Sequence, residues 1–204
     1  MEAFETYKHA GCTIHLYQDD DPMSPREWTN LGVMACYHPH YNLGDEGEDP
    51  RDVMQELEDR GLDATWTNIV DHLKETRGAT VVLPLAIYDH SGITMFAGKK
   101  GDYPFDGAGW DTSNVGFIFD TTETREECGT PLELVEEVLR GEVSEYDQYL
   151  RGNVCGYLVE GRRGGMVDSC WGFYDVDDAK SEAEAAAEHE AENAELMSVY
   201  ESEH

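Results

Sequence analysis

Hydrophobic and polar residues alternate in several short stretches of the chain, a pattern typical of strands with one buried face. Ser91 and Gly92 form a turn signal between two such stretches, and a Gly/Arg-rich segment separates the last two, so two β-hairpins are predicted. The segments expected to form strands are 12–17, 31–38, 79–90, 93–98, 114–120, 153–161 and 165–175.

Helical spacing of apolar residues, together with start and stop signals, marks three further segments. Pro50 stands where a first-turn proline is tolerated, and Gly78 follows the second segment as a stop signal. Thr130 is the expected N-cap of the third segment, which continues with a kink at Gly141. The three helices are expected at 51–60, 64–76 and about 131–151.

The last thirty residues differ in composition from the rest. Residues 175–204 contain one lysine and 11 acids, a net charge of 1 − 11 = −10. We expect a long, solvated helix that is attached near its end, with a weak oligomerisation seam as the alternative. The thin apolar stripe comprises Ala183, Ala187, Ala194 and Met197, and the expected attachment comprises Leu196, Val199 and Tyr200.

Strands and helices are interspersed without regular alternation of the βαβ type. The predicted fold class is therefore α+β, with a mainly antiparallel sheet, several interspersed helices and a long acidic C-terminal helix. We expect one globular domain over 1–174, followed by the helix at 175–204.

The net charge is extreme, because 44 acidic residues face 14 basic ones and give −30. Five lysines against nine arginines, with aromatic residues at 10%, indicate a protein adapted to a salt-rich cytoplasm, as in haloarchaea. Direct binding of nucleic acid or of an anionic membrane is not expected, because both need basic patches. The first residues show no apolar signal segment, and five cysteines without CxxC spacing indicate reduced thiols. We expect a cytoplasmic protein without a membrane segment.

Cys36, His38 and His40 form the sharpest candidate for metal binding. At i, i+2 and i+4 of a strand, the three side chains share one face and suit zinc or another divalent metal. The alternative is that Pro39 breaks the strand and leaves both histidines as edge residues.

Asp89, His90 and Asp111 form a second candidate. If the long loop before Asp111 folds over the strand end, one imidazole and two carboxylates could form a hydrolytic or metal site. The alternative is a turn-capping Asp beside an exposed His. Cys170 is a candidate nucleophile, with a buried, inert thiol as the alternative.

Five blocks together resemble a family of uncharacterised proteins encoded by tailed phages, haloarchaeal viruses and mobile elements. The family has no assigned activity, so the resemblance implies provenance only: a viral accessory gene expressed inside its host. The family carries basic residues after its first His, where this chain has Pro39 and His40, which leaves Cys36 and His38 as the better pair. The blocks are 25–46, 83–93, 109–119, 145–160 and 168–174.

The leading hypothesis is a non-enzymatic viral or mobile-element accessory protein that binds a host macromolecule, a host protein above all, with the blunting of a host defence as one form. Imitation of nucleic acid by the acidic surface is less favoured, because molar salt screens a diffuse charge. A metal-dependent hydrolase or nucleic-acid-processing enzyme is the first alternative. A virion structural component is the second.

Overall fold

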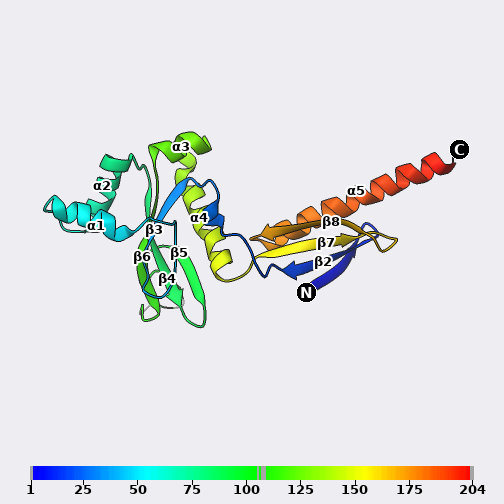
Figure 1. Cartoon of the computed structure of the whole chain (residues 1–204), viewed down its shortest axis with the longest axis horizontal. Coiled ribbons are helices and arrows are strands. Elements are labelled where there is room, and N and C mark those ends of the chain that lie inside the picture. The colour runs from blue at the N-terminus through cyan, green and yellow to red at the C-terminus, as the bar shows by residue number, and fades with distance from the viewer. Residues whose placement is uncertain (1, 105, 107–108, 203–204) are drawn as a thin grey trace. The chain divides into compact units, whose positions relative to one another are not determined.

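The computed structural model describes residues 2–104, 106 and 109–202, with side chains up to residue 197. It confirms an α+β fold with two four-stranded antiparallel sheets and a long C-terminal helix (Figure 1). The chain forms two compact units. The central unit is Ser24–Arg151, and the terminal unit combines Met1–Met23 with Gly152–His204.

The sheet of the central unit has the strand order β3-β6-β4-β5, and each neighbouring pair is antiparallel. The predicted hairpin across Ser91 and Gly92 is confirmed, since β4 pairs with β5. β3 ends at Cys36, so the expected strand at 31–38 stops two residues early. The strands are β3 (Gly32–Cys36), β4 (Val82–Asp89), β5 (Ile93–Ala97) and β6 (Thr112–Asp120).

The first two helices of the central unit begin and end where local signals predict. Asp49 caps α1 (Pro50–Asp59) with Pro50 in its first turn, and Thr65 caps α2 (Trp66–Arg77). Gly78 ends α2 in the left-handed conformation, at φ 66°.

The other two helices differ from the prediction. A 3-10 turn at Leu132–Leu134 precedes α4 (Val135–Leu150), so Thr130 does not cap this helix. The short helix α3 (Thr122–Cys128) was not predicted, because it buries no residue and has no apolar periodicity.

Helices cover both faces of the central sheet. Val135, Leu139 and Val143 of α4 pack on one face, while Val53 and Leu57 of α1 pack on the other with α2. The faces alternate along β6, where Ile118 joins the α4 side and Phe117 and Phe119 join the α1/α2 side. The sheet therefore forms the middle of a three-layer unit.

The terminal unit brings the two ends of the chain into one sheet, of order β1-β2-β7-β8. The predicted hairpin at 153–161 and 165–175 is confirmed, whereas β1 was missed because its sequence ETYKH has no apolar face. The elements are β1 (Glu5–His9), β2 (Cys12–Gln18), β7 (Cys155–Glu160), β8 (Met166–Phe173) and α5 (Val176–Ser202).

The long helix α5 is attached by its first turns and not at Leu196. Ala179, Ala183 and Ala187 are fully buried against Ile14, Leu16 and Val159 of the sheet. Small side chains at i and i+4 let the helix lie close to the strands (Figure 1). The expected attachment at Leu196 is wrong, since Leu196 is 69% and Met197 61% exposed.

Ala194 is also exposed, and the side chains of Val199 and Tyr200 lie outside the described residues. The division of the chain differs from the expected boundary at residue 174, because α5 belongs to the same compact unit as β1, β2, β7 and β8. None of the helices in the described residues is long and apolar enough to cross a membrane.

Candidate functional site

The candidate metal ligands Cys36, His38 and His40 do not face one another as a set. Cys36 is the last residue of β3 and lies in the core beside α4, whereas both histidines follow the strand. Burial, together with the charge of Asp45, raises the pKa of the Cys36 thiol to about 12, so the thiol is protonated at neutral pH. The strand alternation on which the prediction depended stops before Pro39.

His38 instead stacks on Tyr41, with 4.8 Å between ring centroids, and contacts His40 edge-on at 5.8 Å. Within the part of the chain that the structure describes, no three His, Cys, Asp or Glu side chains form a group that could hold a metal ion.

The His90 and Asp111 side chains come together at the end of the sheet where β4 stops and β6 starts, and Asp89 joins them through its backbone. His90 Nδ1 lies 3.3 Å from Asp111 Oδ2, and the Asp89 N–H donates to the Asp111 carbonyl at 2.9 Å. Tyr41 O–H donates to Asp89 Oδ2 at 2.9 Å, and this bond raises the pKa of Tyr41. The His90 and Asp111 side chains are 65% and 46% exposed, so water reaches both.

Asp106 holds the loop that carries Asp111. Its carboxylate accepts hydrogen bonds from the Trp110 and Asp111 N–H groups and from the Thr112 hydroxyl. The Thr112 bond and the backbone donors lower the pKa of Asp106, so it stays ionised and keeps its hydrogen bonds to Trp110, Asp111 and Thr112. The result is a turn-stabilised, exposed His–Asp pair.

Cys170 lies in the terminal unit on β8, an edge strand of its sheet, and its side chain is exposed. The alternative of a buried thiol is therefore wrong. Its register partner on β7 is Tyr157, whose hydroxyl donates to Asp168 at 2.8 Å.

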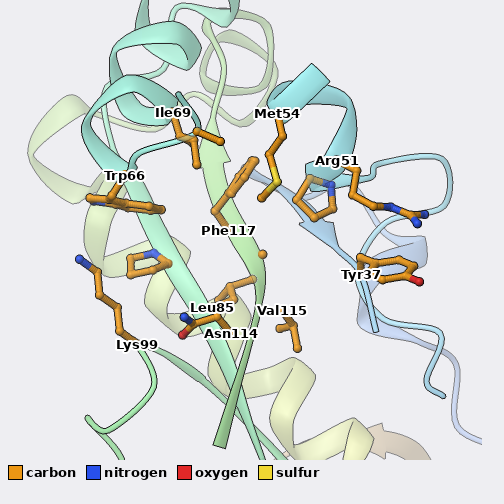
Figure 2. A pocket seen from close by; sticks show the side chains of 14 residues that line it. Tyr37, Arg51, Met54, Trp66, Ile69, Leu85, Lys99, Asn114, Val115 and Phe117 are labelled. Carbon is orange, nitrogen blue, oxygen red and sulfur yellow. The ribbon is translucent and has the colours of Figure 1, made fainter. Parts of the chain in front are cut away.

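A groove that the sequence pattern did not reveal lies between the α1/α2 layer and the central sheet (Figure 2). Its volume is about 460 Å³. Figure 2 shows Met54 and Ile69 pointing from the helices toward Phe117, with Trp66 and Tyr37 on opposite sides. The remaining lining residues are Pro50, Arg51, Ala64, Pro84, Leu85, Lys99, Asn114, Val115 and Gly116.

Local features of the chain place these residues. The Thr65 cap puts Trp66 in the first turn of α2, and the Pro50 start puts Met54 one turn into α1. At Gly116 the strands come unusually close, since a Cβ there would lie 1.9 Å from the Ala35 carbonyl oxygen. Only glycine fits this part of the groove.

Each aromatic side of the groove carries a cation against its ring. The Arg51 guanidinium carbon is 3.6 Å from the Tyr37 centroid, and the Lys99 ammonium is 5.3 Å from the Trp66 centroid. Asp49 binds Arg51 through both of its oxygens, which raises the pKa of Arg51 and lowers that of Asp49. For Lys99, no carboxylate of the described residues lies within ion-pairing distance of the ammonium.

The charge of the groove is opposite to that of the chain. Two cations and no Asp or Glu are among the 14 described residues that line it, although 44 of the 204 residues are acidic. An apolar floor with cations at both ends suits an apolar group that is flanked by negative charge. Comparisons with protein-family models, with curated proteins and with solved structures gave no match for this chain.

Proposed function

We propose that this chain is a non-enzymatic accessory protein of a virus or mobile element, that it acts inside a salt-rich host cell, and that it binds a host protein through the groove of the central unit. The observation that supports this proposal is the local reversal of charge: an acid-free, apolar groove with Arg51 and Lys99 at its rim in a chain of net charge −30.

The segment that enters the groove carries an apolar side chain flanked by carboxylates. Apolar burial against Phe117 and Trp66 supplies most of the affinity, and Lys99 selects a negatively charged flank. Arg51 contributes less to this selection, because Asp49 already pairs with it. A nucleic acid fits less well, because its regularly spaced phosphates would meet the acidic surface around the groove. A short acidic peptide segment needs complementary charge only at the rim of the groove, where Arg51 and Lys99 lie.

The test is a pull-down from host lysate at native salt, followed by affinity measurement with the recovered partner. Lys99→Glu and Lys100→Glu change the net charge equally at adjacent positions, but only Lys99 lines the groove. We expect Lys99→Glu to weaken binding about tenfold or more and Lys100→Glu to stay within about twofold. Equal effects of the two variants, or recovery of no stoichiometric partner, would refute the proposal.

A metal-dependent hydrolase is the second candidate, and the contact between His90 and Asp111 favours it. The pair offers one imidazole and one carboxylate, and Asp89 reaches it only through its backbone N–H, because the Asp89 carboxylate accepts from Tyr41. A catalytic cation at this pair would therefore take its remaining ligands from water and substrate. Metal analysis of protein purified without chelator tests this candidate. A metal-free preparation, with a His90→Ala variant that behaves like the wild type, would exclude it.

A further inference from the structure

The sheet of the terminal unit has one face covered by α5 and one face that α5 leaves open. On β1, Tyr7 donates to Glu184 and His9 pairs with Glu188 of α5, so these two side chains face the helix. Strand alternation then places Thr6 and Lys8, with their register partners on the neighbouring strands, on the opposite face. The open face comprises Thr6, Lys8, Thr13, His15, Tyr17, Gly156, Leu158, Glu160, Ser169 and Trp171.

Aromatic rings dominate one end of this open face. Trp171 lies over Gly156 so closely that a Cβ at Gly156 would be 2.4 Å from the indole ring, and its centroid is 5.9 Å from that of Tyr17. Trp171 is 43% exposed, and Tyr17 beside it is partly exposed. Two neighbouring aromatic side chains thus remain partly in water on this face, which indicates an interaction site.

The open face is also nearly neutral. It carries Lys8 and Glu160, and the carboxylate of Glu160 lies 3.5 Å from His15 Nε2. Helix α5, on the other side of the same sheet, carries eight acids and one lysine between residues 176 and 197. The terminal unit therefore has one strongly acidic side and one side without net charge.

We propose that a second copy of this chain docks on the open sheet face, so that two copies pair face to face. Each copy carries −30, so contact through acid-rich surface brings like charges together, whereas contact through this face adds none. Symmetric pairing requires a self-complementary surface. Here the large rings of Tyr17 and Trp171 stand among small residues (Thr6, Thr13, Gly156 and Ser169), and packed sheets interdigitate large and small residues in this way.

The proposed self-association surface is thus the open sheet face and not the C-terminal helix. Ala183 and Ala187 of the predicted stripe are already buried against their own sheet, and Leu196 and Met197 are exposed among acids. With a single lysine, the open face is unsuited to a polyanion. The groove of the central unit has no part in this proposal, so pairing of two copies and binding of a partner in the groove can each be refuted without the other.

The test is the mass of the full-length chain at molar KCl, by light scattering and sedimentation over a range of concentrations. Ser169→Glu adds a charge to the open face at an exposed position, and Ser181→Glu adds the same charge to the exposed side of α5. We expect a wild-type dimer, a dissociation constant raised about tenfold or more by Ser169→Glu, and an unchanged constant for Ser181→Glu.

A second pair of variants separates lost contact from lost folding. Trp171→Ala removes the ring on the open face, and Trp110→Ala removes a ring that is 87% exposed in the central unit. Only the first should weaken the dimer, with the circular dichroism spectrum unchanged in both. A monomeric wild type, a dimer insensitive to Ser169→Glu, or a dimer dissociated by Leu196→Glu instead would overturn the proposal.

Discussion

Among the charged residues of the central unit, Arg26 is expected to contribute most to the free energy of unfolding, and Arg26→Met tests this. Its side chain is 5% exposed and donates to both oxygens of Asp45, to Glu142 and to the Gly32 carbonyl, at 2.6–3.0 Å. Burial alone lowers the pKa of Arg26, but the two carboxylates outweigh burial and raise it. Arg26 therefore stays charged.

Replacement of Arg26 leaves two carboxylates in the protein interior without their cation. Breaking a buried ion pair costs about 3–5 kcal/mol. Asp45 retains the Met34 N–H, and Glu142 retains the Leu31 N–H, so both anions keep some of their hydrogen bonds. We therefore expect a loss near the lower limit, about 3 kcal/mol of the free energy of unfolding.

The deficit should shrink as the pH falls. Burial already raises the pKa of Glu142 and Arg26 lowers it, so without Arg26 this pKa rises further. A carboxyl whose folded pKa exceeds its unfolded value costs stability while it is ionised, and protonation removes that cost as the pH falls through the raised pKa. Arg26→Met should therefore lose least stability in acid.

Urea unfolding followed by circular dichroism measures these effects, with Arg140→Met as the matched control. Arg140 pairs with Glu136 at the surface of α4, at i and i+4, and its side chain is 51% exposed. Such pairs contribute about 0.5 kcal/mol or less. A deficit for Arg26→Met no larger than that of the control, or one that grows in acid, would refute the reasoning.

Three further substitutions test particular contacts. Gly116→Ala puts a Cβ 1.9 Å from a carbonyl oxygen of β3 and should cost about 1–3 kcal/mol in urea unfolding. Thr112→Val removes the hydroxyl that lowers the pKa of Asp106, and with it the stability that this hydrogen bond gives the ionised carboxylate. The wild type loses this stability as the pH falls through the lowered pKa of Asp106, so the melting temperatures of variant and wild type should converge in acid. Ala183→Glu buries a charge between α5 and its sheet and should unfold the terminal unit at lower urea, whereas Ala185→Glu, at an exposed position, should not.

Elements that depend on neighbouring residues could be predicted from the sequence. Pro50, Gly78 and the Ser91–Gly92 turn each act within a few residues, and they correctly gave α1, α2 and the β4/β5 hairpin. α3 and β1 have no apolar period, because neither provides a continuous hydrophobic face to a core. Period-based prediction has no signal to detect in such segments.

The candidate site was predictable only in part. Asp89 and His90 end a strand, and Asp111 precedes the next one, so their proximity followed from the pattern. Cys36 and His38 were separated because β3 ends at Cys36. In the groove, Trp66 and Ile69 belong to the apolar spacing that predicts the helix at 64–76, but sequence cannot distinguish a helix face that fills a core from one that borders a cavity.

The groove and the open sheet face are both poor in acidic residues. Acids make up 44 of 204 residues, yet the groove lining has none among its described residues and the open face has Glu160. A surface that imitated nucleic acid would concentrate charge where a partner binds, whereas here charge is sparse where apolar surface is exposed. Molar salt screens the acids but leaves apolar attraction intact. In such a chain, contact surfaces are therefore best sought where the acids are missing.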